Sequence, residues 1–491
     1  MATNHQLVEI ILDQTLACQD PHSVESQSRH GGIYQPLGPY IPGDQGSYPT
    51  TDAAMEALAE LADNVRENAS DVKLAVSRDR MRMITSEVFG ASLNELCREA
   101  DRTKHWPILR KRIFESTRAS GKDIVHYVPV WLFVGQECAP FNIGPIKFVP
   151  RSSWLGEIRR RRGKESPWMA TVETLWSGGI VNDGSRWSGI KGAVTAFRRN
   201  RRSPHMLYQA YKDAKRFSEP THVFHGRMVA RLVHPDQWVG CCEVKGFETE
   251  ESRRRGVLAV RVALDTIRLA LVRPNRALIS TAADSVQPLS IERLSQLEQR
   301  DLAHGFRINR QGVSGAPGLA KAILDGSRDL FDAAGACISG AASTSNQHAC
   351  PNLAERWLNA VHWYGRACLA DVDFVGVVML VIALDVLSGG LEQKGILELV
   401  ARLTGTAMSQ QVLNDGTSLK QLVDRTYKLR SEVAHGSILA VHAQLDDARG
   451  QLEDLASAAL DHYVTRLQKY ADAGGIDDRD EFLKSLPAAT P

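Results

Sequence analysis

Arg430 and His435 stand with four residues between them in the segment YKLRSEVAHG (427–436), near the end of a predicted helix. Histidine takes up and releases protons near neutral pH. The guanidinium group of arginine stabilises negative charge that builds on phosphoryl oxygens. One arginine and one histidine can therefore cut RNA without a metal ion.

The spacing R-x4–6-H is not specific in this chain, which contains 15 histidines. Six other pairs satisfy it: Arg98/His105, Arg198/His205, Arg199/His205, Arg216/His222, Arg227/His234 and Arg356/His362. The surroundings of Arg430 must therefore decide whether this pair is a site.

Arg430 falls in the middle of a mostly apolar helical stripe. The other members of the stripe are Leu419, Leu422, Val423, Thr426 and Val433. A guanidinium group is rarely buried without a partner, so we expect Arg430 to meet a carboxylate, a phosphate or a subunit interface. The plainer alternative is an arginine that bridges buried carboxylates, beside a histidine at a frayed helix end.

His435 would lie about 140° around a continuous helix from Arg430, so the two side chains would diverge. Gly436 is well placed to end the helix at C′ and to let His435 turn back. Alternatively, a second copy of the helix in a dimer would bring two such pairs together.

The elements around this pair are predicted to be helical, at about 352–370, 372–388, 394–413, 418–435 and 442–471. Gly389 and Gly390 are expected to stop the second helix, and residues 414–416 separate the third from the fourth. We treat 352–475 as one helical bundle and 476–491 as a polar tail.

Residues 352–471 resemble the HEPN superfamily, most closely its ApeA-like branch. The resemblance rests on RWLNA (356–360), ALDVL (383–387) before the glycine turn, LVDRTYKLRS (422–431), and His435-Gly436. It implies a ribonuclease site made of Arg430 and His435, usually formed across a homodimer. Ser431, Asp385 and Tyr427 are carried over as supporting residues. Relatives often have Glu where this chain has Asp385.

The resemblance also implies how the site works. The histidine takes the proton of the ribose 2′-OH, the arginine stabilises the phosphoryl oxygens, and the partner's histidine protonates the leaving group. The products would be a 2′,3′-cyclic phosphate and a 5′-hydroxyl, with no metal and no cofactor. Related proteins serve in bacterial anti-phage defence, by abortive infection, so we expect RNA as substrate and a phage-derived or nucleotide trigger. The alternative is a catalytically silent HEPN module for dimerisation or nucleotide binding in a larger complex.

The rest of the chain is predicted to be mixed, so the fold class is α+β with several domains. An N-terminal arm and helical segment spans 1–120, with helical spacing from residue 51. A mixed α/β sensing or regulatory region spans 121–340, with strands at 122–150 and 221–247 and a helix at about 250–272. The small, polar residues 338–351 are predicted to be a linker.

Two arginine clusters of this region are candidates for RNA binding. They comprise Arg159, Arg160, Arg161, Arg162, Arg198, Arg199, Arg201 and Arg202. Four nearby tryptophans, at positions 154, 168, 176 and 187, could stack bases. The favoured alternative is that the arginines are solvated surface residues and the tryptophans belong to a core.

The composition places limits on other functions. The net charge is only +2, so any contact with nucleic acid must come from local patches. The eight cysteines form no C-x2-C pair, and no zinc-type Cys/His spacing occurs, so we expect neither a disulfide framework nor a metal site. The longest apolar run, 374–387, is too short to span a membrane. We therefore expect a cytoplasmic protein without a membrane partner.

Overall fold

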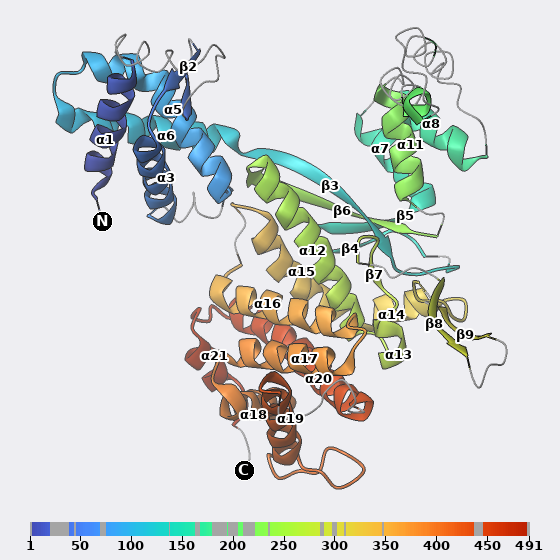
Figure 1. The fold of residues 1–491 in the computed structure, drawn as a ribbon. Helices are drawn as coiled ribbons and strands as arrows, with labels where there is room; N and C mark the ends of the chain where they lie inside the picture. The colour runs from blue at the N-terminus through green and yellow to red at the C-terminus, as the bar shows by residue number, and fades with distance from the viewer. Residues whose placement is uncertain are drawn as a thin grey trace.

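The computed structural model describes most of the chain. Described are residues 2–19, 39–43, 46–68, 75–136, 138–162, 167–178, 194, 205–209, 221–233, 236–284, 311–345, 348–436 and 445–488, and the backbone of 289–296 and 302–308. All structural statements below refer to these residues. The fold is mixed α+β, as the sequence predicts, with helices dominating (Figure 1).

The N-terminal unit has a hydrophobic core of its own. Its elements are α1 (Asn4–Cys18), β1 (Tyr40–Gly43), β2 (Gly46–Pro49), α3 (Asp52–Glu67), α5 (Arg78–Arg98), η1 (Arg102–Lys104) and α6 (His105–Ser120). Helix α3 begins where the helical spacing predicts, because the Thr51 side chain caps it by accepting the amide of Ala54 at 3.2 Å. The unit meets the next region where the amide of Glu248 donates to the carbonyl of Ala75 at 2.9 Å.

An antiparallel five-stranded sheet follows, in the order β4-β5-β6-β3-β7. Its strands are β3 (Lys122–Trp131), β4 (Phe141–Ile143), β5 (Ile146–Pro150), β6 (Trp238–Phe247) and β7 (Ser280–Thr281). Gly144 forms the β4–β5 turn with a φ of +52°, a conformation that favours glycine. A separate hairpin pairs β8 (Leu289–Gln296) with β9 (Leu302–Ile308).

The two faces of the sheet pack against different helices, because side chains alternate along each strand. Cys242 of β6 is buried in the main core, under α12 (Thr249–Leu269) and α15 (Arg328–Ala342). Its neighbour Cys241 is buried in a smaller core on the opposite face. That face is covered by α7 (Arg151–Arg162), α8 (Pro167–Trp176) and α11 (Thr221–Leu232), all inserted between β5 and β6. Burial raises the pKa of the Cys242 thiol to about 12.

Helix α12 joins the sheet to the helical bundle. It contacts β6 on one side and α16 (Pro351–Cys368) and α20 (Asp446–Asp472) on the other. The approach to α16 requires glycine, since a Cβ on Gly365 would lie 1.8 Å from Oδ1 of Asp265. Arg276 of α13 (Arg273–Arg276) adds an ion pair to Glu453 of α20 at 3.1 Å.

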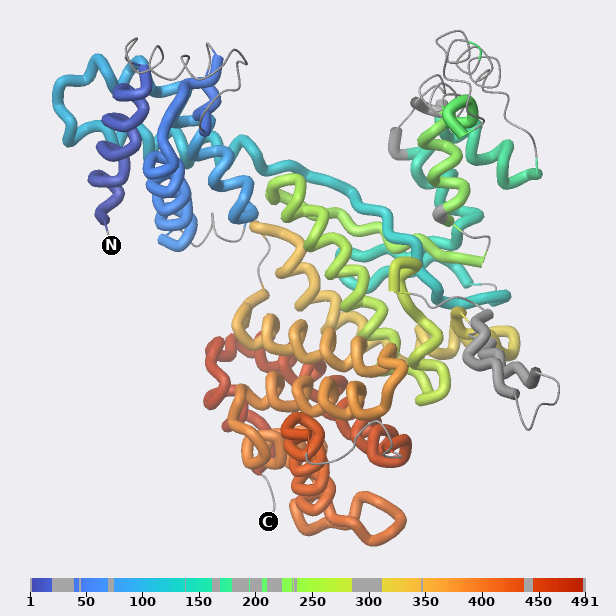
Figure 2. The backbone as a smooth tube through the Cα atoms, viewed as in Figure 1, coloured from blue at the N-terminus to red at the C-terminus, as the bar shows by residue number. Residues whose placement is uncertain are grey.

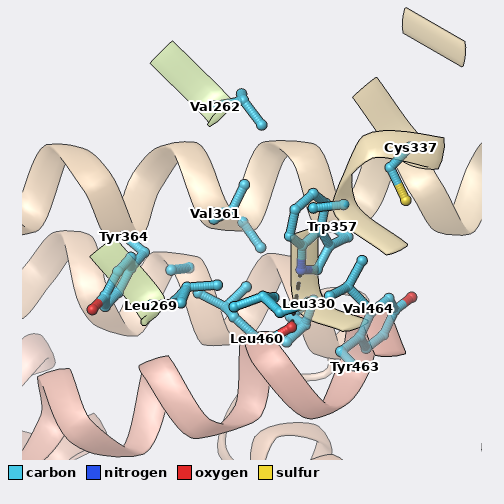
Figure 3. Close-up of a cluster of buried hydrophobic side chains, with 14 of the residues drawn as sticks. Val262, Leu269, Leu330, Cys337, Trp357, Val361, Tyr364, Leu460, Tyr463 and Val464 are labelled. Carbon is cyan, nitrogen blue, oxygen red and sulfur yellow. Dashed lines mark hydrogen bonds between the residues drawn. The ribbon is translucent and has the colours of Figure 1, made fainter. Parts of the chain in front are cut away.

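The bundle consists of α16, α17 (Asp373–Ser388), α18 (Glu392–Thr404), α19 (Leu419–Ala434), α20 and the short α21 (Arg479–Ser485). Figure 3 shows its centre, where the indole of Trp357 lies between α16 and α20 and donates to the carbonyl of Leu460 at 3.0 Å. The predicted stop of α17 is confirmed, because Gly389 caps it in the left-handed region at φ +94°.

Four predictions from the sequence are wrong. The helix predicted at about 394–413 ends at Thr404, because Gly405 caps it with a left-handed φ of +68°. Residues 221–232 form helix α11 rather than a strand, and the buried positions Val223, Gly226 and Val233 recur at helical spacing. The predicted linker at 338–351 is helical up to Ala342, and Ile338 is fully buried. The predicted polar tail contains α21, whose Phe482 packs edge-on against Tyr463.

The mixed region and the bundle share one hydrophobic core, so no boundary separates them at 338–351. The main core runs without a break from Val128 of β3 to Leu486, just after α21. The view of the chain as a tube shows α15 beside α12 and next to α16, the first helix of the bundle (Figure 2). The sheet and the bundle therefore form one structural body on a shared core.

Candidate functional site

Helix α19 carries the arginine and the histidine. Ser418 begins it with a capping box, in which its side chain accepts the amide of Gln421 and the Gln421 side chain accepts the amide of Ser418. The first half of the predicted stripe is buried: Leu419, Leu422, Val423 and Thr426. The last turns are less covered, and every described residue from Tyr427 to Gly436 is half-buried or exposed.

Arg430 is half-buried and has no carboxylate within ion-pair distance in the part of the chain that the structure describes. Its Cζ lies 5.9 Å from the centroid of the Tyr427 ring, one turn earlier. Among the described residues, Arg430 therefore does not bridge buried carboxylates. With no acid paired to it among the described residues, the guanidinium group is available to an anion.

Asp385 and Tyr427 lie in the same neighbourhood as Arg430. Burial raises the pKa of the Tyr427 hydroxyl, the charges of Glu392 and Asp385 raise it further, and the charge of Arg430 opposes them. The carboxylate of Asp385 accepts the amide of Glu392 at 3.0 Å, across the glycine turn between α17 and α18. Asp385 thus holds the start of α18 and does not form an ion pair with Arg430.

Glu392 is a residue of this neighbourhood that the sequence did not single out. It begins α18, and among the described non-glycine residues it alone has a positive φ, of 55°. Such a backbone is unfavourable for a side chain with a Cβ and is kept only where its surroundings require it. The sequence could have indicated Glu392 by its position directly after the glycine turn at 389–391.

His435 is exposed at the end of α19, as the cap residue. Its amide donates to the carbonyl of Ser431 at 2.9 Å, so the helical hydrogen-bond ladder still includes it. The chain leaves the helix only at Gly436, whose φ is +68°. Gly436 therefore ends the helix as predicted, but His435 does not turn back. Within one chain the side chains of Arg430 and His435 diverge. Ser431 is half-buried.

The arginine clusters proposed for RNA binding are paired with acids where their side chains are described. Arg159 pairs with Glu173 at 2.6 Å, and Arg160 pairs with Glu157 at 3.1 Å. The side chains of Arg161 and Arg162, and residues Arg198, Arg199, Arg201 and Arg202, lie outside the described part. Trp154 is buried, and Trp168 and Trp176 pack around it in the smaller core, so they are core residues.

Among the described residues, neither a group of metal ligands nor a single membrane-spanning helix occurs. No group of three His, Cys, Asp or Glu residues there stands where it could hold a metal ion. No single described helix is both long and apolar enough to cross a membrane. Helices α17 and α18 reach that length and apolarity only as a pair, which bends by 73° at its break.

Comparison with protein-family models, with curated proteins and with solved structures gave no match for this chain. The resemblance of residues 352–471 to the HEPN superfamily therefore rests on the motif residues alone. The fold is that of a mixed α+β protein with a helical bundle, in which helix α19 ends in an arginine–histidine pair.

Proposed function

We propose that the chain is a metal-independent endoribonuclease of the HEPN type, whose site is formed by Arg430 and His435 of two protomers. One observation carries the proposal: α19 ends in a half-buried arginine that has no carboxylate partner among the described residues, followed by an exposed histidine. A half-buried guanidinium group without a nearby acid keeps its charge available for a phosphate.

The divergence of the pair is the reason for a second protomer. A general base and a phosphate-binding cation must reach the same phosphodiester, and one straight helix end does not permit this. Two copies of α19, packed through the half-buried Leu429 and Val433 beside Arg430, would place one protomer's histidine near the other's arginine. This arrangement gives a homodimer, or a larger assembly built from dimers.

The chemistry then follows from the side chains. His435 accepts the proton of the 2′-OH, the oxygen attacks the adjacent phosphorus, and the bond to the 5′-oxygen breaks as the partner's histidine protonates that oxygen. Arg430 stabilises the charge on the two non-bridging oxygens. Tyr427 and Asp385 act through position, since the ring lies beside Arg430 and the carboxylate anchors α18.

The test is cleavage of a short RNA by the purified chain, in the presence of EDTA. We expect products with 2′,3′-cyclic phosphate and 5′-hydroxyl ends, and no cleavage when a 2′-deoxy nucleotide replaces the one at the cut. His435→Ala should reduce the rate by at least ~100-fold. Full activity of His435→Ala, or loss of wild-type activity in EDTA, would contradict the mechanism.

Helix α20 offers a matched control. His462 and Arg466 are both exposed there, and they have the same residue types and a similar spacing. The variants His462→Ala and Arg466→Ala should cleave at the wild-type rate. A loss of activity in these variants equal to that of His435→Ala would mean that general surface charge, rather than the α19 pair, supports cleavage.

A role in bacterial defence, by cutting RNA after a phage-derived or nucleotide trigger, is the cellular part of the proposal. It predicts that overexpression is toxic and that Arg430→Ala abolishes the toxicity. The second candidate, a catalytically silent HEPN module, predicts no effect of Arg430→Ala on toxicity. The presence of both Arg430 and His435 favours the enzyme.

A further inference from the structure

A pocket of about 380 Å³ lies on the smaller-core face of the sheet, where α7, α8 and α11 cover it. This volume is within the range of small-molecule sites. Its lining residues come from both the sheet and the covering helices: Tyr127, Pro129, Trp154, Ile158, Trp168, Val229, Val233 and Val239. The pocket thus lies at a seam between two layers.

The walls of the pocket are aromatic and aliphatic. The rings of Tyr127 and Trp154 are 5.7 Å apart and nearly perpendicular, and those of Trp154 and Trp168 are 6.5 Å apart with a tilt of 37°. None of the lining side chains carries a charge. Transfer of a charged ligand into such surroundings would be costly, whereas a flat ring would meet rings on several sides.

Trp154, one of the lining residues, has a polar group without a partner among the described residues. The residue is only 4% exposed, and its indole Nε1 has no acceptor in the described part of the chain. Other indoles in this fold are satisfied, since Trp238 donates to the carbonyl of Phe133 at 2.8 Å and Trp176 to that of Ala230 at 3.3 Å. A buried N–H without a partner in the chain leaves one donor for an acceptor from outside the described residues.

Ion pairs hold the walls of the pocket in place. Lys147 of β5 pairs with Glu157 of α7 at 2.5 Å, and Arg159 of α7 pairs with Glu173 of α8 at 2.6 Å. Gly226 lets α11 pack closely on α8. A Cβ at this position would lie only 2.5 Å from Cβ of Thr171. Arg159, a candidate for RNA binding from the sequence, thus joins α7 to α8 over the pocket.

We propose that this pocket binds an uncharged, flat aromatic or heteroaromatic molecule that presents one hydrogen-bond acceptor to Nε1 of Trp154. The inference does not rest on the ribonuclease proposal, because none of the lining residues belongs to the bundle.

Two small probes test it: quinoline, whose ring nitrogen is an acceptor, and naphthalene, which has the same shape without one. Binding of each to the full chain is measured at pH 7.5 by ligand-observed NMR titration. Quinoline should bind saturably, and Trp154→Phe should weaken it about fivefold, the effect of one hydrogen bond. Naphthalene should bind wild type and Trp154→Phe about equally.

A second variant tests the location independently. Val229→Trp places a larger side chain at the half-buried edge of the pocket and should abolish binding of both probes. Trp363→Phe, at a 37% exposed tryptophan of α16, is the control and should bind like the wild type. Each variant is checked for an unchanged thermal transition, and Val229→Trp alone decides the location if Trp154→Phe does not fold.

Three outcomes would overturn the inference. They are no saturable binding of quinoline to the wild type, unchanged binding of both probes to Val229→Trp, and equal loss of naphthalene and quinoline binding in Trp154→Phe. The last would show that the indole contributes only its ring.

Discussion

Two helix ends of this molecule carry an arginine in opposite situations. Arg268, at the end of α12, is 2% exposed, and its guanidinium group donates to the carboxylate of Asp265 and to the carbonyls of Arg276 and Ile279. Arg430, near the end of α19, is half-buried and has no described carboxylate partner. The first arginine is fully used by the fold, between the sheet and the bundle. The second is available to bind an anion.

Loss of Arg430 should affect catalysis and not stability, whereas loss of the Arg268 ion pair should affect stability. The largest effect is expected on catalysis. Arg430→Ala should reduce RNA cleavage by ~100-fold or more, because a cation that stabilises the phosphoryl oxygens is lost. Its thermal transition should stay within about 2 °C of the wild type, since no described ion pair is removed. The measurements are single-turnover cleavage and thermal unfolding. A large fall in stability with Arg430→Ala would show that the two arginines are alike.

The converse variant is Asp265→Ala. It leaves Arg268 buried without its counterion, so the free energy of unfolding should fall by about 3–5 kcal/mol. Urea unfolding, followed by far-UV circular dichroism, measures this. The alanine also leaves room beside Gly365, so Asp265→Asn serves as the control that keeps the shape. If both variants unfold like the wild type, the pair is not a stabilising element.

A weaker effect is expected at Asp284, which lies just after β7 and joins Arg261 of α12 to Arg366 of α16 at 2.9 and 3.2 Å. Burial raises the pKa of its carboxyl, but hydrogen bonds from Thr281 and the charge of Arg261 outweigh burial and hold the pKa below 3.8. A lowered pKa stabilises the fold above the unfolded-state pKa, and this stabilisation is lost as the pH falls through the folded-state pKa. Asp284→Asn should therefore cost ~1 kcal/mol at pH 7, and the difference from the wild type should shrink below pH 3.8. A difference that persists unchanged in acid would mean that the carboxylate charge is not its source.

The smallest effect is expected at the paired surface arginines of α7. The double variant Arg159→Gln/Arg160→Gln should change the free energy of unfolding by no more than ~1 kcal/mol. The affinity for RNA and its dependence on salt should stay unchanged, because both charges are already matched by Glu173 and Glu157. Filter binding at low and moderate salt measures this, with Arg430→Gln for comparison. A reduced salt dependence in the α7 variant would restore these arginines as an RNA-binding surface.

The sequence predicted well where a local pattern had no strong competitor. The strands at 122–131 and 146–150, the helix after residue 249 and the bundle helices follow from periodicity and capping residues. It failed at residues 221–232, where aromatic and β-branched residues imitate a strand. Val229 and Val233 pack into the smaller core, and α11 packs against α8, which decides for a helix there. A single sequence does not contain that packing.

The candidate site shows the same division. The sequence alone determined that Arg430 and His435 lie near a helix end at Gly436, because capping and spacing are local properties of the chain. Only the tertiary structure decided that Arg430 has no carboxylate partner among the described residues and that Asp385 anchors α18. These depend on which residues α17 and α18 place beside α19, and such contacts between distant segments are set by packing rather than by sequence order.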